Sequence, residues 1–213
     1  MTDQAPAAND TTTLSAAYRA IGVTFKSLEA TSRDIRDLLE DAREIARSSA
    51  SVLLLGETGT GKNLIAQAIH NGSPRSGGPF VSLNCAAIPE TLLEAELFGS
   101  EEGAYTGASA TRKGRFELAN AGTLFLDEIG DLSAQAQAKI LHAIEYREFT
   151  RVGGQKTLSS DVRIIAATNA PLEDRVKGNT FRSDLFYRLN EVVLRVPPLR
   201  ERKRDIPALI EHF

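Results

Sequence analysis

The chain has 213 residues, of which 42% are hydrophobic, 25% charged and 6% aromatic, values typical of a globular protein and unlike those of a disordered or fibrous chain. It contains no run of 18 apolar residues and no basic start followed by an apolar stretch, so we expect no membrane span, no signal peptide and a cytoplasmic protein. The formal net charge of −3 argues against binding nucleic acid mainly through phosphate contacts.

The predicted elements begin after a polar stretch. Residues 1–25 are rich in Ala and Thr without periodicity, which predicts a flexible N-terminal arm. From Ser32 to about residue 48, apolar residues recur at helical spacing. Short apolar runs then alternate with helical patterns: we predict strands at 51–55, 80–83, 122–126, 162–167 and 192–196, and helices at 63–70, 90–98, 134–145 and 182–188. This alternation predicts an α/β fold with a mostly parallel sheet covered on both faces.

Two segments interrupt the alternation. Residues 99–115 form a long insertion rich in Gly, Ala, Ser and Thr, and residues 148–158 place a Gly153-Gly154 turn between short polar strands. Long connections inside compact α/β domains are usually functional. We expect one domain over residues 26–204, followed at 205–213 by the start of a further helix that the chain does not complete.

A glycine-rich loop lies between the first strand and the next helix. Backbone N–H groups and a helix N-terminus cradle polyphosphates in this context, and Lys62 would reach the β and γ phosphates. The predicted nucleotide-binding residues are Gly56, Glu57, Thr58, Gly59, Thr60, Gly61, Lys62 and Asn63. Asn63 stands where such loops usually carry a Ser or Thr that binds magnesium, so the magnesium geometry is less defined than the phosphate site.

Polar side chains end three other strands. Asp127 and Glu128 close an apolar strand at the sheet edge where ligands of α/β folds bind, and we predict that Asp127 holds Mg²⁺ through water while Glu128 orients the attacking water. Thr168-Asn169 and Asn84 occupy corresponding strand ends. The acidic pair could instead cap the next helix, although the phosphate loop upstream favours the functional interpretation. Asn84 and Thr168-Asn169 could simply cap their strands.

The insertion carries the most specific motif. Residues 94–99, EAELFG, lead to GAYTGA, formed by Gly103, Ala104, Tyr105, Thr106, Gly107 and Ala108. Further motifs are GTLFLDEIGD at 122–131, FRSDLFYRLN at 181–190 and PPLRER at 197–202. From residue 26 onward the chain thus resembles the AAA+ ATPase domain of bacterial enhancer-binding proteins, the activators of sigma-54 RNA polymerase. The hexapeptide is similar to that family's GAFTGA loop, with Tyr105 in place of Phe.

The resemblance implies a P-loop AAA+ three-layer α/β/α fold and an ATPase that uses ATP and Mg²⁺. It implies that Lys62 is the Walker A lysine, Asp127 and Glu128 are the Walker B pair, and Asn84 is the switch that holds Glu128. Thr168 and Asn169 would be sensor I. Arg182 and Arg188 would be arginine fingers acting on a neighbouring subunit. Residues 103–108 would contact sigma-54 holoenzyme.

The same resemblance implies self-assembly into a ring, expected to be a hexamer. Enhancer DNA would be bound only through a domain absent from this chain or through a partner subunit, and the helical lid would begin near residue 205. Two alternatives remain open: a generic AAA+ remodeller, against which the GAYTGA loop argues, and a non-catalytic nucleotide-gated assembly module, suggested by Asn63 and the incomplete lid.

The remaining features predict structural roles. Cys85, the only cysteine, is expected to be a buried small residue. His70, His142 and His212 lack metal-ligand spacing. A basic group near the end of the chain is predicted to be a solvated joint toward the lid. It comprises Arg195, Arg200, Arg202, Lys203 and Arg204. In the alternative interpretation, Arg200 or Arg202 faces the nucleotide.

Overall fold

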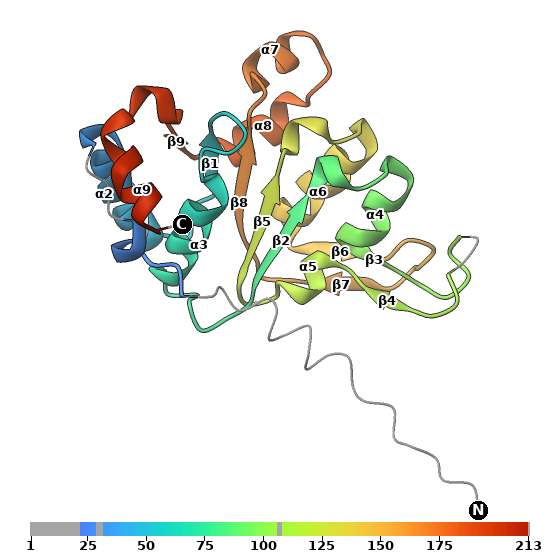
Figure 1. Cartoon of the computed structure of the whole chain (residues 1–213). Helices are drawn as coiled ribbons and strands as arrows, with labels where there is room; N and C mark the ends of the chain where they lie inside the picture. Colours follow the sequence, from blue (N-terminus) through green and yellow to red (C-terminus); the bar gives the residue numbers. More distant parts are fainter. Residues whose placement is uncertain (1–21, 29–31, 106–107, 213) are drawn as a thin grey trace, which may run out of the picture.

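The computed structural model describes residues 22–28, 32–105 and 108–212. A five-stranded, wholly parallel sheet forms the centre, in the order β2-β5-β8-β1-β9 (Figure 1). Its strands are β1 (Val52–Leu55), β2 (Phe80–Asn84), β5 (Thr123–Asp127), β8 (Arg163–Thr168) and β9 (Val192–Arg195). The predicted α/β fold with a mostly parallel sheet is therefore confirmed.

Helices cover both faces of the sheet (Figure 1). The α-helices are α2 (Arg33–Ala46), α3 (Lys62–Asn71), α4 (Glu90–Phe98), α5 (Arg115–Leu118), α6 (Ala134–Tyr146), α7 (Leu172–Lys177), α8 (Ser183–Leu189) and α9 (Ile206–His212). Short 3-10 turns are η1 (Lys26–Leu28), η2 (Cys85–Ala87), η3 (Ile129–Asp131), η4 (Leu199–Glu201) and η5 (Lys203–Asp205).

The strands are apolar on both faces because each face has its own core. Along β1, Leu53 points into the cluster shared with α4, α5, α6 and α8, while Val52 and Leu54 point into the cluster shared with α2 and α3. Successive strand residues point to opposite faces, so a strand buried on both sides is apolar throughout. Each fully buried Leu, Ile or Phe side chain contributes about 1.5–3 kcal/mol, so the two cores together hold the sheet rigid beneath its loops.

The connections between strands run toward opposite edges of the sheet on the two sides of β1. The connection from β1 through α3 crosses to β2 at one edge, whereas the connection from β8 through α7 and α8 crosses β1 to reach β9 at the other edge. Crevices at the carboxyl ends of strands flanking such a point are where open α/β sheets bind ligands.

The two segments that interrupt the alternation are antiparallel hairpins beside the α4–α6 face (Figure 1). One pairs β3 (Gly99–Ser100) with β4 (Arg112–Lys113), and the other pairs β6 (Glu148–Thr150) with β7 (Thr157–Ser159). The predicted short strands around Gly153-Gly154 are confirmed, whereas β3, β4, α5 and α7 were not predicted from the sequence.

The N-terminal end of the described chain packs on α2 and α3, and the segment after β9 is hydrogen-bonded to the start of α2. Phe25, the last residue of the predicted arm, is buried against this pair of helices, and residues 1–21 lie outside the described residues. Asp205 is buried and accepts hydrogen bonds from the backbone N of Ser32 at 2.6 Å and from its Oγ at 2.8 Å, at the N-terminus of α2. The segment after β9 is thereby attached to the start of the domain.

Candidate active site

The glycine-rich loop follows β1 and ends where Lys62 begins α3. Gly59 and Gly61 have φ angles of 83° and 93°, and nothing lies within 4 Å of the position that a Cβ would occupy at either residue. The loop therefore leaves open space at the N-terminus of α3, where backbone N–H groups and the helix dipole favour an anion. These features fit the polyphosphate of a nucleotide.

Lys62 lies inside this loop. Only 6% of the residue is exposed, and its Nζ donates hydrogen bonds to the carbonyl oxygens of Gly56 at 2.8 Å and Glu57 at 3.1 Å. The Glu128 carboxylate approaches Nζ to 4.0 Å. The ammonium is thus held between the loop and the acidic end of β5, and its phosphate-binding role stays a prediction.

Asp127 and Glu128 leave β5 in different directions. Glu128 has φ 51° and ψ 48°, a left-handed conformation uncommon for a residue other than glycine, and its backbone N donates to Asp127 Oδ1 at 3.0 Å. Burial raises the pKa of Asp127 above its ordinary value, and the neighbouring Glu128 carboxylate adds to the shift. A carboxylate with a raised pKa at the edge of a phosphate loop is typical of a cation site or a catalytic site.

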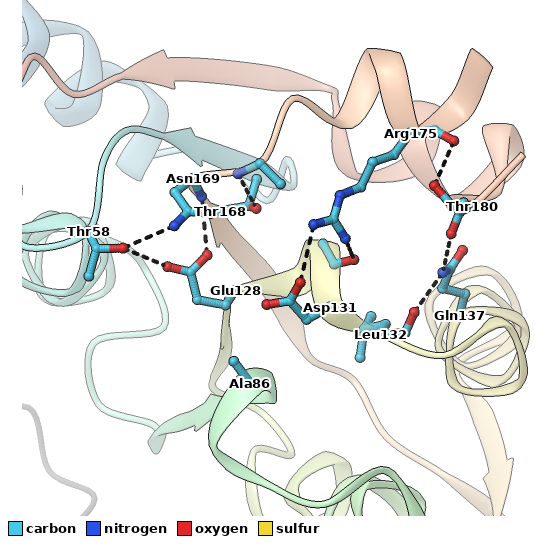
Figure 2. Close-up of polar contacts among 12 residues, drawn as sticks. Thr58, Ala86, Glu128, Asp131, Leu132, Gln137, Thr168, Asn169, Arg175 and Thr180 are labelled. Carbon is cyan, nitrogen blue, oxygen red and sulfur yellow. Dashed lines mark hydrogen bonds and ion pairs between the residues drawn. The ribbon is translucent and has the colours of Figure 1, made fainter. Parts of the chain in front are cut away.

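Figure 2 shows how the Glu128 carboxylate is held. One oxygen accepts from the backbone N of Asn169 at 3.1 Å, and the other lies 3.5 Å from Thr58 Oγ. Asn169 Nδ2 donates to the same Thr58 hydroxyl at 3.0 Å. The end of β5, the end of β8 and the phosphate loop therefore meet at one carboxylate, as expected for residues at the carboxyl ends of parallel strands.

The other two predicted strand-end residues have local partners. Asn84 pairs in register with Asp127, and its Oδ1 accepts from the backbone N of Ala86 at 3.0 Å and of Ala87 at 3.2 Å. No hydrogen bond joins Asn84 to Glu128 in the part of the chain that the structure describes, so the switch contact stays a prediction. Thr168 is buried and its Oγ accepts from the backbone N of Ala170, which shapes the turn ahead of α7.

The site suits a magnesium ion that is shared with phosphate. Among the described residues no group of three or more His, Cys, Asp or Glu side chains could hold a metal by itself. Mg²⁺ usually combines one or two carboxylates with substrate phosphates and waters, a pattern that Asp127 at the loop fits. Asn63 is exposed, and its Oδ1 accepts from Gln67 Nε2 at 2.9 Å, one turn along α3.

Arg182 and Arg188 lie at opposite ends of α8, Arg182 as its N-cap and Arg188 in its last turn. Arg182 makes two hydrogen bonds to the Asp184 carboxylate, at 3.0 and 2.7 Å, and these raise the pKa of its guanidinium. Arg188 donates to Glu191 at 2.7 Å. Both guanidinium groups are paired away from the phosphate loop of their own chain.

Two arginines of the predicted basic joint contact the phosphate loop. Arg200 makes a two-pronged ion pair with Glu57, both distances being 2.7 Å, and these bonds hold the pKa of Glu57 below its ordinary value. Arg202 donates to the carbonyl oxygen of Thr60 at 2.8 Å. The sequence analysis interpreted this group mainly as a solvated joint, because Glu57 is distant in sequence from Arg200 and a backbone carbonyl, the partner of Arg202, is not visible in the sequence.

The GAYTGA loop closes on itself beyond the β3–β4 hairpin. The backbone N of Gly103 donates to the carbonyl of Ala108 at 2.8 Å, and the N of Ala108 donates to the carbonyl of Tyr105 at 3.0 Å. Tyr105 is 37% exposed. Thr106 and Gly107, two of the predicted partner-binding residues, lie outside the described residues.

Arg151, from the second hairpin, ties the two hairpins together. Its guanidinium donates to Glu101 at 2.9 Å and to Glu117 at 2.7 Å, and its side chain is 18% exposed. Val152 exchanges backbone hydrogen bonds with Gly99 and Glu101. The base of the GAYTGA loop is therefore fastened to the β6–β7 hairpin, a contact that the sequence did not reveal.

The expected burial of Cys85 is confirmed. Cys85 is 2% exposed, and burial raises the pKa of its thiol to about 12, so it is a protonated packing residue at neutral pH. None of the helices among the described residues combines the length and apolar character that a bilayer span requires.

Comparison with known proteins places the chain in a family. The family described as the sigma-54 interaction domain matches residues 28–195. The Nif-specific regulatory protein of Azospirillum lipoferum is 52% identical over 195 residues, 92% of this chain and 31% of that protein. The regulatory protein AtoC of Escherichia coli is 58% identical over 177 residues, 83% of this chain and 38% of that protein. The chain thus spans about a third of the length of these relatives.

Comparison with solved structures agrees with this family assignment. The structure of NtrX from Brucella abortus in complex with ATP superimposes with a TM-score of 0.81 at 37% identity, covering 95% of this chain and 43% of NtrX. The family match covers residues 28–195, which include both the phosphate loop and the acidic end of β5. The chain belongs to the sigma-54 interaction domain family, the AAA+ nucleotide-binding domain of sigma-54-dependent transcriptional activators.

Proposed function

We propose that this domain hydrolyses ATP as a ring-forming oligomer and uses the GAYTGA loop to remodel sigma-54 RNA polymerase holoenzyme. The observation that carries the proposal is the meeting of three separate segments at Glu128: the phosphate loop through Thr58 and Lys62, the end of β5, and the end of β8 through Asn169. Such a convergence on a carboxylate beside an anion cradle is what phosphoryl transfer to water needs.

Each residue then has a separable task. Bound ATP with Mg²⁺ would supply the phosphoryl group to be transferred and the charge neutralisation that this transfer requires. Lys62 would exchange the carbonyl oxygens of Gly56 and Glu57 for phosphate oxygens, and Asp127 would hold the cation through water. Glu128 would orient the attacking water, while the N–H of Asn169 keeps its carboxylate in place.

Arg182 and Arg188 would complete the site of an adjacent subunit. Both pair with acidic side chains on or beside α8 rather than with their own phosphate loop, and Arg182 and Asp184 are about half exposed. An exposed guanidinium can exchange its carboxylate partner for a phosphate at little cost. In a ring this exchange would make hydrolysis depend on the contact between subunits.

The GAYTGA loop would carry the nucleotide state to the partner protein. Its exposed Tyr105 provides an aromatic contact, and Arg151 fastens its base to the hairpin that follows α6. Because α6 begins just after the turn that follows Glu128, a change at the site can reach the loop through packed elements. The partner contact itself would come from residues 103–108.

Two substitutions test the catalytic assignment. Lys62→Ala should abolish nucleotide binding, whereas Glu128→Gln should retain binding and lose hydrolysis by about a hundredfold or more, because it removes the water-orienting charge without disturbing the cradle. Binding is measured with a fluorescent ATP analogue and hydrolysis by phosphate release. Lys177→Ala and Glu173→Gln, both on the exposed surface of α7, serve as matched controls and should behave as wild type.

The outcomes separate the candidate functions. Equal, near-wild-type turnover in Lys62→Ala and Glu128→Gln would overturn the catalytic assignment. Tight ATP binding by wild type without measurable hydrolysis at any protein concentration would instead favour the non-catalytic assembly module, for which the engaged carbonyl of Asn63 is the supporting observation.

A further inference from the structure

Gln137 is a buried amide on the second turn of α6 whose hydrogen bonds all lead to other segments. It is 1% exposed, and its Nε2 donates to the carbonyl oxygens of Leu132 at 2.9 Å and Thr180 at 3.2 Å (Figure 2). Its Oε1 accepts from the backbone N of Arg182 at 2.8 Å. Both N–H donors and the oxygen of this amide are thus used.

These three partners belong to two functional segments. Leu132 ends the turn that begins at Glu128, and Thr180 and Arg182 form the short stretch between α7 and α8. Gln137 is the first residue of an otherwise apolar stripe on α6, continued by Leu141 and Ile144. A polar residue at such a position is retained only where its hydrogen bonds are satisfied, so its amide marks a specific link.

Arg175 makes a second connection between the same two segments (Figure 2). Its guanidinium donates to the carbonyl oxygen of Gly130 and, at 3.3 Å, to the Asp131 carboxylate. Its own carbonyl oxygen accepts from the backbone N of Thr180 at 2.9 Å and of Phe181 at 3.1 Å. The stretch before α8 is therefore fixed to the turn after Glu128 from two sides.

The backbone of Arg182 is held more firmly than its side chain. The backbone N is bound by a buried amide, whereas the guanidinium is about half exposed and, among the described residues, bound only to Asp184. A long, flexible side chain acts at a defined place only if its backbone is fixed there. Gln137 supplies that fixed point within the chain.

We propose that Gln137 is a positioning residue that sets Arg182 relative to the turn after Glu128, so that Arg182 can complete the nucleotide site of the adjacent subunit. This inference rests on the proposed ATPase function and on the in-trans role of Arg182. It links a subunit's own catalytic carboxylate to the arginine that the same subunit presents to its neighbour.

The test replaces the amide with an apolar side chain of similar length. Gln137→Met should lower ATP turnover by about a hundredfold, the loss typical of a misplaced catalytic group, while ATP binding stays within about twofold of wild type. Gln135→Met, two residues away on the exposed side of α6, is the matched control and should be silent. Hydrogen exchange at the Arg182 amide should accelerate in Gln137→Met alone, because that N–H loses its acceptor.

Mixed subunits separate a positioning role from general damage. Mixing Gln137→Met with Lys62→Ala should restore part of the activity, because the Lys62→Ala subunit still presents a correctly placed Arg182. Mixing Gln137→Met with Arg182→Ala should restore none. Gln137→Asn keeps both the donors and the acceptor on a side chain one carbon shorter, so it should lose no more activity than Gln137→Met, and it supplies a second variant if the Met variant folds poorly.

Three outcomes overturn the inference: turnover in Gln137→Met equal to that in Gln135→Met, rescue by Arg182→Ala subunits, or unchanged exchange at the Arg182 amide. A different result marks failure of the proposed function instead. If wild type does not hydrolyse ATP, or Arg182→Ala retains full activity, the function itself fails, and the exchange measurement still decides whether Gln137 holds Arg182.

Discussion

Burying Asp127 at the end of an apolar strand costs stability. The pKa of this carboxyl is raised, mainly by burial, so the folded state prefers the protonated form. The folded state therefore binds more protons than the unfolded state at pH values between the ordinary pKa of 3.8 and the raised value, and the free energy of unfolding falls as pH rises through that window. At pH values above the raised pKa the whole penalty is present.

Asp127→Asn should remove this penalty. We expect the melting temperature of the nucleotide-free domain to rise by about 1–3 °C at pH 7, since ~1 kcal/mol shifts a chain of this size by roughly 2–4 °C. The gain should shrink as pH is lowered through the raised pKa toward the ordinary value of 3.8, because the wild-type carboxyl then becomes protonated in the folded state. Thermal unfolding at several pH values measures this, with the exposed Asp174→Asn as control. A lower melting temperature in Asp127→Asn would show that the carboxylate is stabilising.

Among the elements, the two hairpins depend on each other. Arg151 is largely buried between Glu101 and Glu117, and these charged hydrogen bonds join β3–β4, α5 and β6–β7. A second ion pair, Arg147–Asp161, lies just after α6 and serves for comparison, because both of its side chains are well exposed. A shielded, two-partner arginine contributes more than an exposed ion pair.

Arg151→Met should destabilise the domain by about 1–2 kcal/mol, because it leaves two carboxylates without their shared partner. Arg147→Met should cost less than about 0.5 kcal/mol. Denaturant unfolding compares the two variants, and hydrogen exchange over residues 99–105 and 108–113 should rise only in Arg151→Met. Equal losses in both variants would mean that Arg151 does not fasten the loop.

The elements that could be predicted from the sequence are those whose own residues form a clear apolar run or a helical pattern. The five strands of the sheet are local apolar runs, and α2 and α6 show helical spacing. In contrast, β3 and β4 have two residues each and depend on pairing with each other and, for β3, on contacts with Val152, and α7 is a six-residue polar helix with little local signal. Tertiary contacts, rather than propensity, determine such short elements.

The residues of the candidate site also fall into two groups, those that the sequence predicted and those that it did not. Lys62 lies in the glycine-rich loop after one predicted strand, and Asp127 and Glu128 end another, so a parallel sheet alone predicted that they would lie together at its carboxyl edge. Gln137 and Arg202 act on backbone carbonyls or amides of distant segments, and no complementary side chain exists to reveal the contact. For Gln137 the available signal was a polar residue within an apolar helical stripe.

At the scale of the whole molecule, the arrangement of α8 predicts cooperation between copies. Because Arg182 and Arg188 pair away from their own phosphate loop, an isolated subunit should be nearly inactive. Arginine fingers are worth about 10³–10⁵ in rate where they have been measured. Specific ATPase activity should therefore rise steeply with protein concentration, in step with the mass measured by light scattering. Activity that stays constant while the mass increases would make these arginines surface ion pairs.

The most direct test of the account joins the nucleotide site to the loop. Purified sigma-54 is mixed with the domain in ADP plus aluminium fluoride, which mimics the phosphate during transfer, and the complex is resolved on a native gel. We predict a complex that forms only with the trapped nucleotide, is kept by Tyr105→Phe and by the exposed control Tyr146→Ala, and is lost in Tyr105→Ala, because an aromatic anchor supplies much of such a contact. A complex that forms equally with Tyr105→Ala, or without nucleotide, would contradict the account.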